Sequence, residues 1–357
     1  MKSKILPQAS KIHIGGRRIG PGEPVYIVAE MSANHHQDYE EAVNILRAAK
    51  DAGADAVKIQ TYTADTITLR SDKDFFRLSG GTLWDGRQLH DLYREAYTPW
   101  EWQPRLKAIA EEIGLDLFSA AFDPTAVEFL ENMGVPVHKV ASFEIVDIPL
   151  IRCMARTGKP LIISTGMASR EEIGEAVEAA RQSGAVEIAI LKCTSAYPAP
   201  PAEMNLLAIP DLAAAFEVPV GLSDHTLGIT VPVAGVTLGA CIVEKHLTMT
   251  RSKPGPDSAF SLEPHEFKYM VDAIRTAEKS LGRADALPSE RELPMRSLRR
   301  SLFVVADVKA GDLITERNVR SIRPGYGLHT RHMGEVIGRR AVRDLEKGTP
   351  LAWEMLT

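Results

Sequence analysis

Short apolar runs alternate with amphipathic stretches along most of the chain. The runs are rich in β-branched residues and bounded by glycine or proline, which is typical of strands buried on both faces of a parallel sheet. The stretches between them, such as 39–52 and 171–182, carry apolar residues at helical spacing. The eight runs are 25–30, 56–62, 115–122, 137–142, 160–166, 187–195, 219–225 and 241–247. Eight strand–helix units within about 280 residues predict an α/β fold, a closed (β/α)8 TIM barrel.

Polar and ionisable residues gather at the C-terminal end of the predicted strands. In a (β/α)8 barrel these ends and the loops after them build the active site, so the distribution predicts an enzyme. The residues in question are Glu30, Lys58, Gln60, Lys139, Ser142, Glu144, Ser164, Ser223, His225 and His246.

The alternation of side chains along a strand predicts which of these residues point inward. Inward pairs two residues apart are Lys58 with Gln60, Ser223 with His225, and Glu244 with His246. Lys245 falls on the apolar side and is therefore expected just past the strand, on the rim. His225 and His246 end adjacent strands and could reach one metal ion, with Mn, Zn, Fe or Co favoured over Mg or Ca. The alternative is a pair of hydrogen-bonding core histidines. Asp257 and Glu30 are possible further ligands or partners of the ligands.

Lysines and hydroxyl groups surround the same barrel mouth. The lysines are Lys58, Lys139 and Lys192, and the hydroxyls come from Ser142, Ser164, Thr165 and Ser223. The motif STGM at 164–167 is expected to open a helix, whose first N–H groups favour anions. Together these features predict a phosphate or carboxylate pocket. Internal pairing of the lysines with Glu30, Glu144 and Glu244 is the alternative, expected for one lysine and not for all three.

Segments outside the eight units predict the domain organisation. Residues 11–22 read as a β-hairpin that could plug the N-terminal end of the barrel. The long insertion 64–99 is expected to wall a pocket, to pack on the barrel as a surface helix, or to do both. The segment DVKAGDLI at 307–314 recurs as DLEKGTPL at 344–351, which predicts a small pseudo-symmetric β-rich domain. We therefore expect a catalytic barrel with the hairpin at 1–283, a linker at 284–298 and the small domain at 299–357.

Composition narrows the functional class. With 25% charged residues and a net charge of −5, the chain shows no sign of a nucleic-acid surface. No apolar run approaches the roughly 20 residues needed to span a bilayer, and no signal-peptide core is present. Cys153, Cys193 and Cys241 are isolated and are interpreted as buried hydrophobes. A cytoplasmic enzyme is the expectation.

Eight motifs give the chain a resemblance to a known family. They are AEMSANH (29–35), DAVKIQTY (55–62), HKVASFE (138–144), LIISTGM (161–167), KCTSAYP (192–198), GLSDHT (221–226), VEKHLT (243–248) and KPGPD (253–257). In this order they resemble the sialic acid synthase family, which includes the N-acetylneuraminate synthases. The segment from 301 is similar to that family's antifreeze-like (SAF) domain. The resemblance implies a transferase that condenses phosphoenolpyruvate with a hexosamine derivative to a nine-carbon ulosonic acid.

Within the family the chain most resembles the pseudaminic acid synthases, through SANH after Glu30, KIQTYTAD at 58–65 and GGTLWDGRQLHDLY at 80–93. Ser195 stands where neuraminate synthases often have Asn. The implied reaction joins phosphoenolpyruvate, 2,4-diacetamido-2,4,6-trideoxy-altrose and water into pseudaminic acid and phosphate. The alternative products are N-acetylneuraminate or legionaminate, made from N-acetylmannosamine or a related hexosamine.

The resemblance also implies residue roles. His225 and His246 would hold a divalent metal, most often Mn²⁺, while Glu30 and Gln60 would lie near the reacting atoms and Asp257 near the sugar. Glu30 would either stabilise a cationic carbon or handle a proton. Arg323 would reach the substrate from the partner subunit in a domain-swapped homodimer. The phosphoenolpyruvate site would be lined by Lys58, Lys139, Ser142, Ser164, Ser195, Tyr197 and Ser223, with Thr165 adjacent.

Two other functions are compatible with parts of the pattern. A metal-dependent barrel aldolase or a 3-deoxy-ulosonate synthase would share the barrel and the metal site. Ice or glycan binding through the SAF-like domain is a non-enzymatic alternative. The charges of Lys309, Asp312, Glu346 and Lys347 speak against an ice-binding face, which is typically flat and weakly charged.

Overall fold

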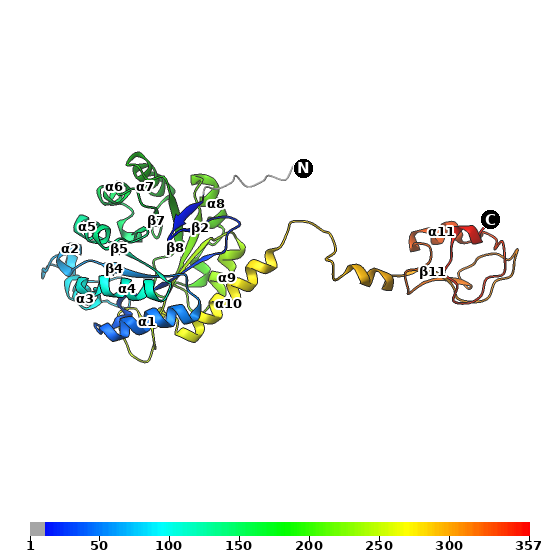
Figure 1. The fold of residues 1–357 in the computed structure, drawn as a ribbon, viewed down its shortest axis with the longest axis horizontal. Helices are drawn as coiled ribbons and strands as arrows, with labels where there is room; N and C mark the ends of the chain where they lie inside the picture. The colour runs from blue at the N-terminus through cyan, green and yellow to red at the C-terminus, as the bar shows by residue number, and fades with distance from the viewer. Residues whose placement is uncertain (1–10) are drawn as a thin grey trace. The chain divides into compact units, whose positions relative to one another are not determined.

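The structure is a computed structural model and describes residues 11–357. The chain divides between Gly282 and Arg283 into two compact units, a larger barrel unit and a smaller C-terminal unit (Figure 1). None of the helices in residues 11–357 combines the length and the apolar character needed to cross a membrane.

Eight parallel strands close the predicted barrel in the order β10-β3-β4-β5-β6-β7-β8-β9. Their bounds are β3 (Tyr26–Glu30), β4 (Ala56–Thr61), β5 (Asp116–Ala121), β6 (His138–Val140), β7 (Leu161–Ser164), β8 (Ile188–Cys193), β9 (Val220–Asp224) and β10 (Ile242–His246). Each lies within the run that predicts it. Almost every strand residue is buried, because the barrel interior covers one face and the helices cover the other.

Helices surround these strands (Figure 1). They are α1 (Tyr39–Ala52), α4 (Gln103–Glu112), α5 (Pro124–Met133), α6 (Ile148–Ala155), α7 (Arg170–Gln182), α8 (Ala208–Phe216), α9 (Thr230–Thr237) and α10 (Pro264–Leu281). Local sequence sets their ends, as α1 illustrates. The side chain of Asp38 accepts hydrogen bonds from the first N–H groups, and Gly53 ends the helix at a φ of 88°.

The predicted N-terminal hairpin consists of β1 (Ile12–Ile14) and β2 (Arg17–Ile19). The isoleucine side chains are fully buried in the same apolar cluster as Phe118 of β5. Arg17 forms an ion pair with Asp55, which lies directly before β4. The hairpin therefore packs at the N-terminal ends of the strands, the end of the barrel that contributes to stability. The C-terminal ends stay open.

The insertion after β4 folds as α2 (Ala64–Ile67), a 3₁₀ turn η2 (Asp74–Phe76) and α3 (Leu89–Ala96), followed by η3 (Trp100–Trp102). A tight loop joins its halves, with Leu78 N donating to Arg87 O and Gly86 N donating to Leu78 O. Further 3₁₀ turns are η1 (Ser32–His35), η4 (Ser142–Glu144), η5 (Pro201–Glu203) and η6 (Ser258–Phe260).

The C-terminal unit contains η7 (Leu293–Leu298), β11 (Ser301–Val304), β12 (Val319–Ile322), η8 (Thr330–His332), α11 (Met333–Val336) and η9 (Trp353–Met355). The two repeated segments pair with each other: Val308 and Leu345 exchange two backbone hydrogen bonds of 2.9 and 2.8 Å. Asp344 accepts from Ala310 N, and Asp307 accepts from Lys347 N. This reciprocal pattern gives the repeat a pseudo-symmetric structure.

Candidate active site

A cavity of about 490 Å³ opens at the C-terminal ends of the barrel strands. Most of the predicted site residues line it, and six of the eight barrel strands, β3, β4, β6, β7, β9 and β10, contribute at least one of them directly. These residues are Glu30, Lys58, Gln60, Lys139, Ser142, Glu144, Ser164, Tyr197, Ser223, His225, His246 and Asp257. The long-range topology of the barrel thus brings together side chains from eight separate stretches of sequence.

A buried charge cluster forms the floor of the cavity. Lys58 Nζ lies 3.0 Å from Glu30 Oε2 and 2.8 Å from Glu244 Oε1, with all three side chains almost fully buried. Burial raises the pKa of Glu30, and the neighbouring charge of Glu244 adds to that effect. Burial opposes ionisation of Glu244 too, but Lys58 and Lys139 hold its pKa below the usual range. Of Lys58, Lys139 and Lys192, only Lys58 forms an ion pair with a glutamate among residues 11–357.

Lys139 presents a different environment. Its Nζ donates to Ser164 Oγ at 2.6 Å and to Val140 O at 2.9 Å. Burial, reinforced by the positive charge of Lys58, lowers the pKa of Lys139 to about 8. Glu144 lines the same cavity, and burial raises its pKa to about 7. A lysine hydrogen-bonded to neutral groups only, beside serine hydroxyls, can bind a phosphate or carboxylate.

The STGM segment is a turn, which corrects the expectation of a helix start. Helix α7 begins at Arg170, and the side chain of Ser169 caps it in a capping box with Glu172. Gly166 N instead donates to Ser142 Oγ at 3.2 Å. A Cβ atom on Gly166 would lie 2.1 Å from Ser195 Oγ, so this close approach requires glycine.

Three predicted contributors lie outside the cavity lining. Thr165 Oγ1 donates to Leu191 O at 3.1 Å and so anchors the turn to β8. Ser195 packs behind Gly166, with its Oγ 3.8 Å from the sulfur of Cys193. Lys192 Nζ donates to Cys193 O and Thr194 Oγ1, away from the other two lysines. Lys192 therefore does not complete the predicted ring of three lysines.

His225 and His246 face each other across the mouth, with their ring centroids 5.4 Å apart. His225 Nδ1 lies 3.0 Å from Thr194 O, which leaves Nε2 for a ligand. His246 Nδ1 is buried and has no hydrogen-bond partner among residues 11–357, and burial lowers the pKa of this histidine. Neutral imidazoles are metal ligands. In the same residues no group of three or more His, Cys, Asp or Glu side chains is arranged around a metal position. His225 and His246 would together hold a divalent metal only if further ligands came from outside these two side chains.

Lys245 does not lie past the strand end, which corrects that expectation. It is the fourth residue of β10 and is fully buried on the outer face of the barrel, where it forms an ion pair with Asp224 of β9 at 2.5 Å. Lys245 also donates to Thr226 O, and Asp224 accepts from Thr226 N. A buried lysine is tolerated here because a carboxylate and a carbonyl satisfy its charge.

Apolar and aromatic side chains from the insertion form a wall of the cavity. Trp84 Nε1 donates to Pro256 O at 3.0 Å, and its ring lies 5.6 Å from that of Tyr197. The insertion both packs on the barrel and walls the cavity. Its lining residues are Ile67, Leu78, Trp84, Leu89, Leu92, Tyr93 and Ala96. The cavity is therefore divided into a charged floor and an apolar wall.

Comparison of the sequence with known protein families agrees with a catalytic barrel followed by a small C-terminal domain. A profile of the NeuB family matches residues 45–286, and a profile of the SAF domain matches residues 299–357. The chain belongs to the NeuB family. It is 43% identical over 331 residues to the pseudaminic acid synthase of Helicobacter pylori, covering 92% of this chain and 97% of that protein.

Other NeuB relatives are nearly as similar. The N,N'-diacetyllegionaminic acid synthase of Legionella pneumophila is 37% identical, covering 94% of this chain and 95% of that protein. The crystal structure of the spore coat polysaccharide biosynthesis protein SpsE of Bacillus subtilis matches with a TM-score of 0.67 and 33% identity, covering 98% and 99% of the two chains. The chain is thus an enzyme of the phosphoenolpyruvate-dependent nonulosonic acid synthases, which excludes a mere ice- or glycan-binding module.

Two residues that line the cavity of this NeuB enzyme, Cys193 and Ser32, are not predicted from the sequence as site residues. Cys193, interpreted from sequence as a buried hydrophobe, lines the cavity with its sulfur 3.8 Å from His225 Nδ1. Burial alone would raise the pKa of this thiol, but hydrogen bonding to His225 lowers it to about 6. Ser32 also lines the cavity. Ser32 lies two residues after Glu30 but beyond the end of β3, so strand parity does not place it.

Arg323 lies in the C-terminal unit of the NeuB enzyme, within the segment RPGYG, and its side chain is exposed. The loop around it is held in place by Ser301, whose Oγ donates to Pro324 O at 2.6 Å and accepts from Gly327 N. Arg323 is thus presented on an ordered loop and is not part of the cavity within the barrel unit.

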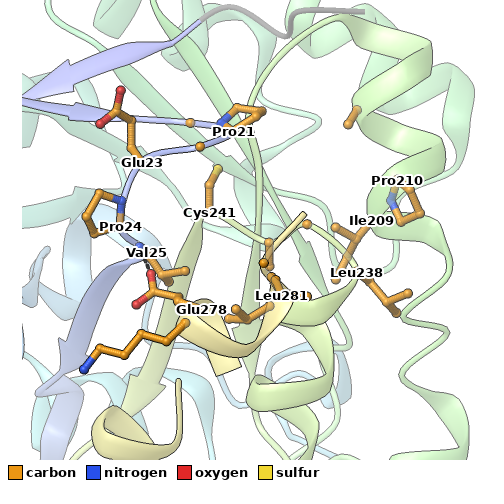
Figure 2. A pocket seen from close by; sticks show the side chains of 18 of the residues that line it. Pro21, Glu23, Pro24, Val25, Ile209, Pro210, Leu238, Cys241, Glu278 and Leu281 are labelled. Carbon is orange, nitrogen blue, oxygen red and sulfur yellow. Dashed lines mark hydrogen bonds between the residues drawn. The ribbon is translucent and has the colours of Figure 1, made fainter. Parts of the chain in front are cut away.

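A second cavity, of about 680 Å³, lies at the other end of the barrel. Figure 2 shows Pro21, Pro24 and Val25 on one side of it, and Ile209 and Leu238 on the other. Glu23 is paired with Lys11, and Glu278 accepts from Val25 N, so the acidic groups on its rim are satisfied. This cavity offers packing surfaces and no cluster of buried charges.

Proposed function

We propose that the chain is a pseudaminic acid synthase. It would condense phosphoenolpyruvate with 2,4-diacetamido-2,4,6-trideoxy-altrose and water to give pseudaminic acid and phosphate. The observation that carries this proposal is the lining of the cavity, which combines an apolar wall from the insertion with a floor of buried charges. The similarity to the pseudaminic acid synthase of Helicobacter pylori supports it.

The apolar wall suits a 6-deoxy sugar, which carries a methyl group where other hexosamines have a hydroxyl. Trp84, Leu92 and Tyr93 can cover such a methyl group and the methyl ends of two acetamido groups. A hydroxyl at the same place would lose its hydrogen bonds to water without replacement, at a penalty of roughly 1–3 kcal/mol. Leu83 does not belong to this wall, because its side chain is 54% exposed.

The floor suits phosphoenolpyruvate. Lys139, Ser164 and Ser142 offer one cation and two hydroxyl groups to its phosphate or carboxylate. Ser223, hydrogen-bonded to Glu244, lies on the same side. When phosphoenolpyruvate binds, charge-assisted hydrogen bonds would orient its carbon 3 toward the sugar aldehyde, which would lie between the floor and the wall.

Glu30 is the group that we assign to proton transfer. Its raised pKa keeps a proton available near neutral pH, and it lies between Lys58 and Gln60, with Gln60 Nε2 3.4 Å from Oε1. Carbon 3 of phosphoenolpyruvate would attack the carbonyl carbon of the aldehyde, while the aldehyde oxygen gains a proton from Glu30. Water would then add to carbon 2, and phosphate would leave by carbon–oxygen cleavage. A carboxyl group whose pKa lies near the working pH serves such steps well.

His225 and His246 would hold the divalent metal, which we propose to be Mn²⁺. The unpartnered ring nitrogen of His246 and the backbone-anchored ring of His225 support this assignment. A metal bound there supplies Lewis-acid polarisation of the sugar aldehyde. Asp257, at the edge of the cavity, would bind a hydroxyl group of the sugar.

Arg323 of a partner subunit would complete the sugar end in a domain-swapped homodimer. Charge supports this proposal: residues 283–357 hold 14 Lys and Arg against ten Asp and Glu, which leaves 28 against 37 for the rest of the chain. Exposed apolar side chains at the mouth, namely Phe143, Met167 and Leu227, support a covering surface. All three cysteines are free thiols, which fits the proposed cytoplasmic location.

A phosphate-release assay with a panel of sugars tests the proposal. The panel holds the 2,4-diacetamido sugars of altro and manno configuration and N-acetylmannosamine, with mass spectrometry of each product. We expect the highest kcat/KM with the altro sugar. A preference for the manno sugar would make the chain a legionaminate synthase, and a preference for N-acetylmannosamine would make it a neuraminate synthase.

A further inference from the structure

Ser32 connects two residues that bound the sugar end of the cavity. Its Oγ donates to Asp257 Oδ2 at 2.5 Å and accepts from Gln60 Nε2 at 2.9 Å. The side chain is only 3% exposed, yet it lines the cavity. A single buried hydroxyl therefore links the segment after β3, the end of β4 and the loop that precedes η6.

The backbone at Ser32 has an unusual conformation. Met31 N still donates to Lys58 O and so continues the pairing of β3 with β4. At Ser32 the chain turns with a φ of 46°, in the left-handed region that residues with a Cβ atom rarely adopt. Strain of this kind is maintained only where the surroundings enforce it, and it concentrates at functional sites.

The hydrogen bonds of Asp257 show what this turn achieves. Asp257 Oδ2 accepts from Ser32 Oγ and, at 3.2 Å, from Ala33 N. Within residues 11–357 no hydrogen-bond donor contacts Oδ1, and Asp257 lines the cavity. One carboxylate oxygen is thus held by the turn, and the other is left for a ligand hydroxyl.

We propose that Ser32 is a positioning residue for the acceptor sugar: its hydroxyl fixes the Asp257 carboxylate and the Gln60 amide, and its left-handed backbone directs that hydroxyl between them. This inference rests on the proposed function, which assigns Asp257 to the sugar and Gln60 to the reacting atoms. The phosphoenolpyruvate end is held by Lys139 and Ser164, which Ser32 does not contact.

Two substitutions separate the hydroxyl from the backbone. Ser32→Ala removes the hydroxyl and keeps the strained turn, whereas Ser32→Gly removes the hydroxyl and relieves the strain. We expect both variants to lose roughly tenfold in kcat/KM for the sugar, because each loses the same charge-assisted hydrogen bond. The KM for phosphoenolpyruvate should stay within about twofold of the wild-type value. The glycine variant should unfold at a higher temperature than the alanine variant.

Ser258→Ala is the matched control. Ser258 is equally buried and lies directly after Asp257, but its hydroxyl faces His36 and does not line the cavity. This variant should lower the unfolding temperature without changing kcat/KM. Wild-type kinetics in Ser32→Gly would assign the effect to backbone shape and overturn the proposal. An equal rise in both KM values, or a loss that follows unfolding temperature across the three variants, would also overturn it.

All variants are measured with the sugar that the wild-type enzyme prefers in the panel. An error in the proposed substrate therefore appears in the wild-type enzyme, as a preference for another hexosamine. An error in the role of Ser32 appears only in the variants. The two failures are thus distinguishable in one set of measurements.

Discussion

The two ends of the barrel each carry a cavity, and the larger one is not the proposed active site. The cavity at the N-terminal ends, about 680 Å³, is bounded by prolines, alanines and aliphatic side chains such as Val25 and Ile209. The cavity at the C-terminal ends is smaller, about 490 Å³, but holds Lys58, Lys139 and Glu244 almost fully buried. Volume alone would therefore select the wrong end.

The difference arises from the cost of burying charge. An ionised side chain in a barrel interior must find a partner or a ligand, so buried charges gather only where their interactions serve the fold or the chemistry. At the N-terminal end the ionised groups lie on the rim and pair locally, as Lys11 does with Glu23. At the C-terminal end Lys139 is buried and hydrogen-bonded to neutral groups. Such a charge is available to an anionic substrate.

Removing either of the proposed metal ligands, His225 or His246, should have a larger effect on activity than any substitution at the other end of the barrel. His225→Ala and His246→Ala should each weaken metal binding by more than about 100-fold, since even partners of a ligand contribute 10–100-fold. Both variants should keep their circular dichroism spectrum and resemble chelator-treated wild-type enzyme. His13→Ala, at the opposite end, is the control and should bind metal normally. Normal metal content and turnover in either active-site variant would remove the assignment.

Arg323→Ala should impair the use of the sugar far more than the binding of phosphoenolpyruvate. We expect roughly a 100-fold loss in kcat/KM for the sugar, because a charge-assisted hydrogen bond is lost and its partner on the sugar is left unpaired. Arg331→Ala, an exposed arginine on the same unit, is the control.

Mixing the Arg323→Ala and His246→Ala proteins tests whether Arg323 acts across subunits. In an exchanged heterodimer one site carries both defects and the other carries neither, so activity should partly return. No recovery despite demonstrated subunit exchange would mean that Arg323 acts within its own subunit or has no role.

Trp84→Ala should change specificity more than it changes rate. Loss of the indole removes the contact with Tyr197 and opens the apolar wall, so a 6-hydroxy sugar can keep its hydration. We expect the preference for the 6-deoxy sugar over N-acetylmannosamine to fall about tenfold, close to the penalty of one unpaired hydroxyl. Leu83→Ala, whose side chain lies outside the cavity, should keep the wild-type preference. An unchanged preference in Trp84→Ala would show that the wall does not select the sugar.

The pH dependence of phosphoenolpyruvate use should report Lys139. Its pKa is lowered to about 8, so the side chain is charged below that pH and loses its charge as the pH rises through it. Proton transfer by Glu30, whose pKa is raised, affects the kcat/KM of both substrates. The ratio of kcat/KM for phosphoenolpyruvate to kcat/KM for the sugar should therefore be constant below pH 8 and fall up to tenfold per unit above it. With saturating phosphoenolpyruvate, kcat/KM for the sugar should lack this alkaline limb. A profile in Lys139→Met that matches the wild type would assign the limb to another group.

The sequence predicts the barrel and the position of its site for a simple physical reason. Buried parallel strands are continuous apolar runs, and the inward parity of Ser223 with His225 and of Glu244 with His246 follows from a period of two. Lys245 is the exception, because a charged residue on the outer face contradicts the apolar pattern. Its partner Asp224 lies on the neighbouring strand, and only the register of β9 with β10 reveals the pair.

Other features depend on contacts that are distant in sequence. The left-handed turn at Ser32 is not encoded by a glycine or asparagine, and the interactions of its hydroxyl come from Gln60 and Asp257. Cys193 resembles any buried cysteine until the fold brings His225 beside its sulfur. The domain boundaries at 283 and 298 remain predictions beside the observed division at Gly282.

The smallest effect on activity should come from the larger cavity. Ile209 is 1% exposed and lines that cavity, at the end of the barrel opposite the proposed metal ligands. Ile209→Ala should reduce the free energy of unfolding by about 2 kcal/mol, at the low end for such truncations, because the existing cavity already limits its packing. Denaturant unfolding measures this loss, while kcat/KM for both substrates should stay within about twofold. A tenfold loss in kcat/KM at full metal occupancy would contradict the view that the N-terminal end of the barrel serves stability and the C-terminal end serves catalysis. It would show that packing at the one end affects the reaction at the other.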